Sequence, residues 1–115
     1  MKWFKTEKQK EKYIQTIWNL YHFSLREKNK GFVYLLSCGK YTKIGRAKDV
    51  NKRFYQVSTA TPYEVKLLAS KEVENCVLLE DILHSSLRDF CIKGEWFELE
   101  ETLVLALTKL LNAEQ

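Results

Sequence analysis

The hydrophobic pattern of this sequence changes its period near Gly31, and that change decides the fold class. Apolar and aromatic residues recur every three or four positions across 6–28, which predicts one amphipathic helix. The next stretch, 32–37, is a run of strand formers, and a turn at 38–40 leads into a second short strand at 41–45. A helix followed by a hairpin predicts a mixed fold of helices and sheet.

The remaining segments continue this mixture. Asp49 is expected to cap a helix that runs to about Val57, and the loop after it holds the only proline, Pro62. Further elements are predicted at 65–69 (a strand), 74–90 (a helix), 94–97 (a short extended segment) and 100–112 (a helix). The predicted fold class is α+β, a small sheet covered by helices in one domain, because 115 residues are too few for two ordinary domains.

The cysteines and the lengths of the uncharged segments indicate the cellular compartment. The three cysteines, Cys38, Cys76 and Cys91, lie far apart and form no C-x-x-C pair, so neither a disulfide framework nor a cysteine zinc site is supported. The longest stretch without a charged residue, 13–25, has 13 residues and is too short to cross a membrane. The N-terminus shows no hydrophobic export segment. We therefore expect a soluble protein of the reducing cytoplasm with no membrane partner.

The charges are distributed unevenly along the chain. Residues 1–30 and 31–70 each carry a net charge of +5, whereas residues 71–115 carry −6. A basic first part is what a chain that docks a polyanion such as DNA would have, and the acidic last part could then hold a metal ion. The alternative is that these charges belong to ordinary solvated helix faces.

Two arginines are candidates for binding phosphate. Arg46 stands just past the second predicted strand, and Arg53 falls on the flank of the apolar stripe of the helix that Asp49 caps. Two guanidinium groups near a helix N-terminus suit a phosphate, because it accepts bidentate hydrogen bonds and interacts favourably with the helix dipole. The alternative interpretation is two solvated arginines.

Three further residues are candidates for the chemistry. Glu80 flanks the apolar face of a predicted helix, where a carboxylate could bind a divalent cation, and His84 lies one turn further on. Tyr34 lies on the first predicted strand, and a phenol beside a cation can relay a proton. Each has a structural alternative: an exposed helix glutamate, a histidine at the edge of the core, and an aromatic core residue.

Several short segments, taken in order, resemble one nuclease superfamily. They are Val33-Tyr34, the stretch IGRAKDVNKRF at 44–54, VLLE at 77–80 and GEWF at 94–97. In this order they resemble the GIY-YIG nuclease superfamily over roughly residues 31–99, and the 44–54 stretch is similar to its bacterial excision-repair version. KIG at 43–45 and Leu83-His84 are similar to a branch common in phages and mobile elements.

The resemblance implies a fold, an activity and a site. It implies a sheet of three antiparallel strands flanked by helices, in a nuclease domain over 31–115 that follows a helical extension over 1–30. The implied activity is that of a DNA endonuclease, which hydrolyses phosphodiester bonds with one divalent metal, Mg²⁺ or Mn²⁺. By position, Tyr34 would help to activate the attacking water. Arg46 and Arg53 would stabilise phosphate charge, and Glu80 would bind the metal.

The sequence also departs from the family pattern. Lys43 stands where many members carry a tyrosine, so Lys43 and His84 become auxiliary catalytic candidates, with Tyr41 as a substitute phenol on the same strand face. Val57 occupies a position where several nucleases carry His or Tyr. These departures favour an alternative function, a nuclease-like module that grips nucleic acid with weak or no cleavage.

The N-terminal helix leaves two alternatives open. Its aromatic residues Tyr13, Trp18 and Tyr21 would either pack against the main domain or form the face of a homodimer. A nuclease that makes two nicks would benefit from pairing. The lysines of the helix could equally follow a DNA backbone.

Overall fold

The computed structural model describes residues 4–112, and along them the chain forms four α-helices and five strands. The helices are α1 (Glu7–Ser24), α2 (Val50–Ala60), α3 (Cys76–Ser86) and α4 (Glu101–Asn112), with a short 3₁₀ turn, η1 (Arg88–Phe90). The strands are β1 (Gly31–Cys38), β2 (Tyr41–Ala47), β3 (Lys66–Val73), β4 (Cys91–Lys93) and β5 (Trp96–Glu98). The predicted ranges 1–30 and 31–115 therefore extend three residues beyond the described part at each end.

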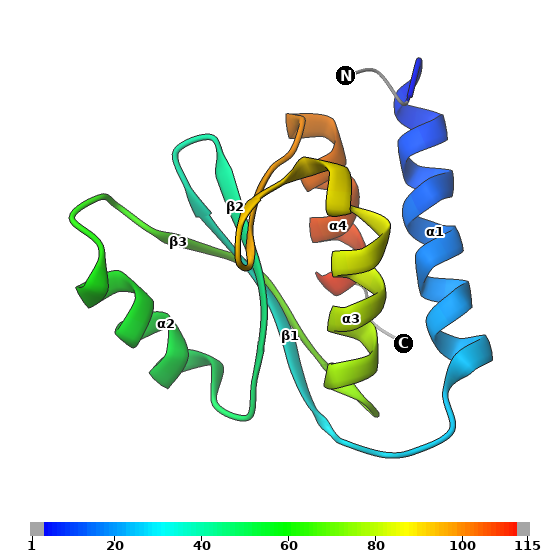
Figure 1. Cartoon of the computed structure of the whole chain (residues 1–115), viewed down its shortest axis with the longest axis horizontal. Helices are drawn as coiled ribbons and strands as arrows, with labels where there is room; N and C mark the ends of the chain where they lie inside the picture. The colour runs from blue at the N-terminus through cyan, green and yellow to red at the C-terminus, as the bar shows by residue number, and fades with distance from the viewer. Residues whose placement is uncertain (1–3, 113–115) are drawn as a thin grey trace.

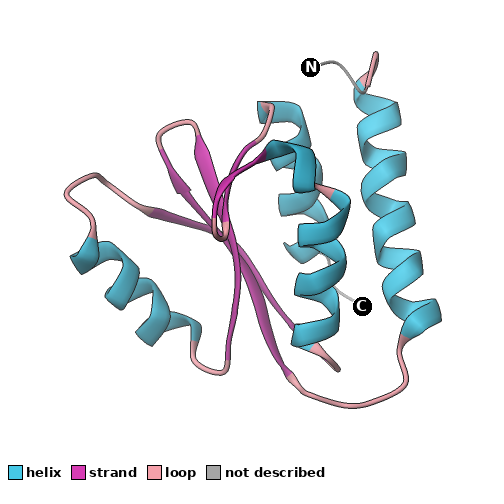
Figure 2. Cartoon of the chain, viewed as in Figure 1, coloured by secondary structure: helices cyan, strands magenta, loops and turns pink. Residues whose placement is uncertain are grey.

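The strands form one sheet in the order β3-β1-β2-β5-β4, and every neighbouring pair is antiparallel. The β1–β2 hairpin lies near the centre, and its register places Tyr34 opposite Gly45 and Val33 opposite Arg46. Helix α2 lies alone on one side of this sheet, and α1, α3 and α4 lie on the other (Figure 1). Figure 2 shows the strands crossing between these two helical layers.

The prediction of a three-stranded sheet is wrong, because β4 and β5 extend the sheet to five strands. β5 pairs with β2, and β4 closes a small hairpin with β5 around Gly94, whose φ of +58° favours glycine. Each of the two strands has only three residues, and β4 is exposed throughout. A strand of three residues is too short to show an alternation of apolar and polar residues in the sequence. β5 forms by pairing with an edge of β2 that would otherwise be unpaired, and β4 then pairs with β5.

Alternate residues of the central hairpin enter two separate apolar clusters. Val33, Leu35 and Ile44 belong to the larger core, beneath α1, α3 and α4. Tyr34 and Leu36 belong to a smaller cluster on the α2 side. The apolar stripe predicted for α2 packs half-buried against this smaller cluster and consists of Val50, Phe54 and Val57. The position of a hairpin residue along its strand therefore decides which of the two helical layers its side chain contacts.

Helix α1 is part of the larger core. Ile14, Ile17, Trp18 and Tyr21 are buried there, so the aromatic stripe of the helix packs against the rest of the chain, which was the first of the two alternatives. A capping box begins the helix, in which the Thr6 side chain accepts from the Gln9 amide. None of the helices in the described residues is both long and apolar enough to pass through a membrane.

Candidate active site

The centre of the candidate site is an ion pair between Arg46 and Glu80. Arg46 lies near the end of β2 on the α3 side of the sheet, and Glu80 lies in the middle of α3, which Asn75 caps. Arg46 Nε donates a hydrogen bond of 3.2 Å to Glu80 Oε1. The arginine side chain is 48% exposed and the glutamate side chain 8%, so the pair joins a buried carboxylate to a guanidinium that reaches solvent.

Only one oxygen of the Glu80 carboxylate has a hydrogen-bond partner. Oε2 is buried and accepts no hydrogen bond from the described residues. Burial raises the pKa of Glu80, the charge of Glu95 raises it further, and His84 and Arg46 lower it. A buried carboxylate oxygen without a partner is costly, and a cation or a donor placed beside it would remove that cost.

Tyr34 lies across the hairpin from Gly45, and its ring occupies the space above that glycine. A Cβ atom added at position 45 would lie 2.5 Å from Tyr34 Cζ and nearer still to the hydroxyl, so only glycine leaves room for the phenol. The hydroxyl is buried and makes no hydrogen bond of ordinary geometry with the described residues. The glycine of KIG is thus explained by the tyrosine it faces.

The Tyr34 hydroxyl responds electrostatically to the other candidate residues. Burial raises the pKa of Tyr34, the carboxylates of Glu95 and Glu80 raise it further, and the guanidinium of Arg53 lowers it. The phenol is therefore protonated at neutral pH. Tyr34 lies on β1, and the three charges that act on its hydroxyl come from α2, α3 and the β4–β5 turn.

Lys43 is engaged by a residue that the sequence analysis did not single out. Its Nζ lies 2.9 Å from Glu95 Oε1 and 5.6 Å from the centre of the Trp96 ring, and its side chain is only 14% exposed. The motif at 94–97 was noticed only as part of a resemblance. The sequence feature that could have identified Glu95 is its position as the acidic residue of that motif, next to a tryptophan.

His84 contacts the backbone of β2. Its Nε2 lies 2.7 Å from the carbonyl oxygen of Ile44, and its ring meets the Phe97 ring edge to face at 5.1 Å. An imidazole N–H that donates to this carbonyl fastens α3 to the sheet, in line with the structural alternative. A role for His84 in carrying protons stays a prediction.

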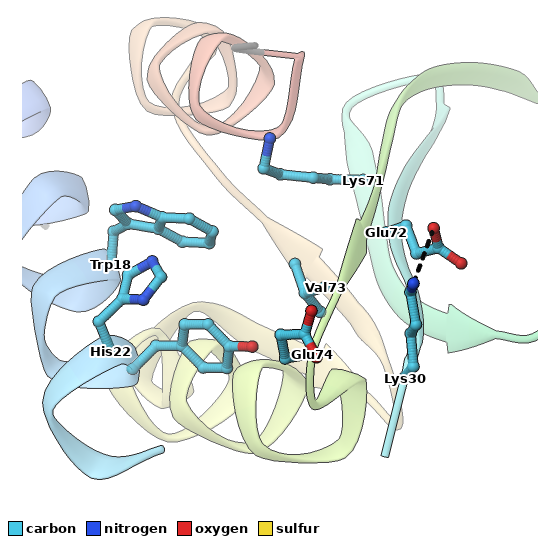
Figure 3. Close-up of a pocket in the computed structure, with 8 residues that line it drawn as sticks. Trp18, His22, Lys30, Lys71, Glu72, Val73 and Glu74 are labelled. Atoms are coloured by element: carbon cyan, nitrogen blue, oxygen red, sulfur yellow. Dashed lines mark ion pairs between the residues drawn. The ribbon is translucent and has the colours of Figure 1, made fainter. Parts of the chain in front are cut away.

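One hollow in the surface lies beside the candidate site, and another lies apart from it. One of about 410 Å³ lies beside the site and is lined by His84, Arg88, Cys91 and other residues of α3 and the β4–β5 hairpin. The other, of about 240 Å³, lies between α1 and β3 (Figure 3). There Trp18 and His22 face β3, away from every predicted site residue.

Metal-binding capacity in the described residues is limited. No group of three or more His, Cys, Asp and Glu side chains among residues 4–112 could hold a metal ion. All three cysteines are free thiols. A cation at this site would therefore depend on Glu80 together with oxygen atoms from water and from a bound phosphate.

Comparison with known families gives one match. A family model described as the T5orf172 domain matches residues 31–112, most of the chain. The chain belongs to the T5orf172 domain family. This is a phage-associated domain of the nuclease-like class, so the protein is a nuclease-like module with DNA as its indicated partner. No curated protein and no solved structure matches the chain.

The assignment to the GIY-YIG superfamily is wrong, because the matching family is the T5orf172 domain. The segments behind that resemblance are short, and local structure accounts for several of their residues. Gly45 leaves room for the Tyr34 ring, and Asp49 caps α2 by accepting from the amide of Lys52 at 3.0 Å. Such residues recur wherever a hairpin leads into a capped helix, so they identify the local structure better than the family.

The raised pKa of Glu80 predicts how stability changes with pH. The pKa of this carboxyl is higher in the folded protein than in the unfolded chain, where a glutamate titrates at about 4.3. The carboxyl therefore contributes to the free energy of unfolding below that pH, and this contribution is lost as the pH rises through the folded pKa. Glu80→Gln keeps an acceptor for Arg46 but does not ionise. We therefore expect this variant to gain stability over the wild type as the pH rises from about 4 to 8, measured by urea unfolding.

The matched control is Asp81→Asn, which removes a charge from the exposed neighbouring residue. This variant should follow the wild type across the same pH range. If the difference between Glu80→Gln and the wild type did not change with pH, the carboxyl of Glu80 would not be destabilised by its surroundings.

Proposed function

We propose that this protein is a DNA endonuclease that hydrolyses phosphodiester bonds with the help of a divalent cation. The observation that carries the proposal is the Glu80 carboxylate, which is buried, bonded through one oxygen to Arg46 and unpartnered at the other. Membership of a nuclease-like family supports the same class of reaction. The working set would be Glu80, Arg46, Arg53 and Tyr34, with Lys43 as an auxiliary residue.

The chemistry of Glu80 suits Mg²⁺ or Mn²⁺. Mg²⁺ is commonly bound through one or two carboxylates, and water and substrate phosphate oxygens complete its coordination. The unpartnered Oε2 is the protein oxygen available for this purpose. When bound, the cation would supply positive charge that stabilises the developing charge on the phosphate and the leaving oxygen.

The two arginines supply the remaining positive charge. The Arg46 side chain is half exposed, so its guanidinium can donate to a phosphate oxygen as well as to Glu80. Arg53 is exposed in the first turn of α2, where the helix dipole also favours an anion. Hydrogen bonds from guanidinium groups stabilise a pentacoordinate phosphate more strongly than neutral donors do.

The raised pKa of Tyr34 indicates what its hydroxyl would do. A phenol that stays protonated donates a hydrogen bond and cannot itself accept a proton from water. We infer that Tyr34 orients the attacking water or a phosphate oxygen. Within the described residues the hydroxyl makes no hydrogen bond of ordinary geometry, and the guanidinium that interacts with it belongs to Arg53, the proposed phosphate ligand.

The exposed surface of α2 and the loop after it suits a nucleic acid. Lys52 and Arg53 are exposed there, and Tyr55 and Tyr63 are 69% and 74% exposed. Lysine and arginine contact phosphates, and exposed tyrosine rings stack on unpaired bases. We propose that DNA approaches the protein over this surface. A homodimer through α1 stays a prediction.

The first test is cleavage of a supercoiled plasmid. We expect the wild-type protein to nick the plasmid with Mg²⁺ or Mn²⁺ and to leave it intact with EDTA. Glu80→Ala should abolish nicking while DNA binding, measured by gel shift, is largely retained, because the carboxylate acts on the cation and makes no contact that attracts DNA. Asp81→Ala is the matched control and should nick like the wild type.

The same assay decides between the endonuclease and the alternative binding module. A salt-sensitive gel shift without nicking by the wild type would support the binding module and contradict the endonuclease. Metal-dependent nicking that persists in Glu80→Ala would contradict the role given to Glu80.

Arg53→Ala tests the stabilisation of phosphate charge. We expect the rate of nicking to fall by about 10²–10³-fold, by analogy with the loss of one donor from an oxyanion hole. Lys52→Ala, at the exposed neighbouring position, should weaken DNA binding slightly and leave the rate at saturating DNA unchanged. Equal rate losses in both variants would mean that Arg53 contributes only general attraction for DNA.

A further inference from the structure

We infer that Glu95 is the general base of the reaction proposed above, the group that takes the proton from the attacking water. The inference rests on the proposed endonuclease function and gives a role to a residue that was not among the predicted site residues. Its basis is the position of Glu95 beside β2, the ion pair that holds its carboxylate, and its electrostatic contact with both Tyr34 and Glu80.

The backbone of Glu95 is fixed against β2. Its carbonyl oxygen accepts a hydrogen bond of 3.0 Å from the Ile44 amide, and the next residue, Trp96, pairs with Lys43 in the β2–β5 register. Glu95 is therefore the last residue of the β4–β5 turn, and its backbone is bonded to the strand that carries Arg46. A group on a paired strand edge is held more rigidly than one on a free loop.

The side chain of Glu95 is oriented but remains accessible. Lys43 Nζ holds Oε1 at 2.9 Å, and Lys43 is itself kept in place by the Trp96 ring. The ion pair engages Oε1, and the side chain is 37% exposed. One oxygen is thus fixed by the lysine, and the other can accept a hydrogen bond from water.

Glu95 also lies close to the two buried groups of the site. Among the charged residues that shift the pKa of Tyr34, Glu95 has the largest effect, and the same is true for Glu80. The backbone of Glu95 is bonded to Ile44, the neighbour of the Gly45 over which the Tyr34 ring lies. A water molecule held by the second carboxylate oxygen of Glu95 would be positioned at the end of β2 beside the Tyr34 phenol.

The other candidate bases are less suitable. Tyr34 is protonated, and Glu80 is buried with one oxygen committed to Arg46. The Nε2 atom of His84 is engaged with the Ile44 carbonyl. Glu95 is the carboxylate near the site that is both held in position and open to water.

The proposed step needs only water and the phosphodiester as reactants. The water oxygen forms a bond to phosphorus while one of its protons passes to a carboxylate oxygen of Glu95. The phosphorus bond to the leaving oxygen breaks, and the electron pair stays on that oxygen, which then takes a proton from solvent. Glu95 returns its proton to solvent and regains its charge, so no net change in the protein remains.

Glu95→Gln tests the assignment with little structural change, because the amide oxygen can still accept from Lys43. We expect the rate of plasmid nicking to fall by about 10²–10⁴-fold, the usual contribution of a general base. DNA affinity and the urea unfolding midpoint should match the wild type. The control is Glu98→Gln on the same hairpin, whose carboxylate lies 3.7 Å from Lys40 and is half exposed; it should nick normally.

A second measurement separates a base from a structural partner of Lys43. In Glu95→Ala, added formate should restore nicking in proportion to its concentration, because a small carboxylate can enter the vacated space and accept the proton. Chloride at equal ionic strength should not. A merely structural role would give no rescue.

The outcomes distinguish this inference from the function on which it rests. If the wild type showed no metal-dependent nicking, the endonuclease and the role of Glu95 would both be overturned. If the wild type nicked and Glu95→Gln nicked at a similar rate, or if formate failed to rescue Glu95→Ala, only the assignment of the base would be overturned.

Discussion

The arrangement of the site depends on one buried carboxylate that is only half satisfied. Glu80 points from α3 towards the sheet, and Arg46 Nε donates to one of its oxygens. Burying an ionised group is expensive, and an ion pair compensates only when the remaining lone pairs also find partners. The Oε2 atom finds none in the described residues. Such incomplete compensation is typical of a position kept for chemistry at the expense of stability.

The residues of the candidate site come from separate elements of the fold. The hairpin directs alternate residues to opposite faces, so Arg46 meets α3 while Tyr34 packs on the α2 side. The absence of a side chain at Gly45 lets the Tyr34 ring lie across β2. The β4–β5 hairpin then brings Glu95 to the open edge of the same strand. The site therefore lies at the end and edge of β2.

Much of the local structure could be predicted from the sequence. The Thr6 capping box, the Asp49 cap and the turn at Gly39 each follow from short-range chemistry, and all are present. The ends of helices were less predictable: the segment expected at 74–90 divides into α3 and the η1 turn. Whether a helix continues past its last buried turn depends on tertiary contacts that the local pattern does not contain.

The candidate site was predictable in part. Arg46 was proposed from its place just past the second predicted strand and Glu80 from its flanking position on a helix, and the structure pairs them. The partner of Lys43 could not be predicted, because Glu95 reaches it only through a strand pairing distant in the chain. The burial of the Tyr34 hydroxyl could not be predicted from the sequence either. The alternation along the strand shows which face a residue takes, and it does not show which side chains cover that face.

The central claim is that the unpartnered oxygen of Glu80 binds a divalent cation. The most direct measurement is a crystal structure of the protein grown with Mn²⁺, with the metal located by its anomalous scattering. The account predicts an anomalous peak bonded to Glu80 Oε2, and its disappearance in crystals of Glu80→Gln. A protein loaded with Mn²⁺ that showed no peak at this carboxylate, or a peak that persisted unchanged in the variant, would contradict it.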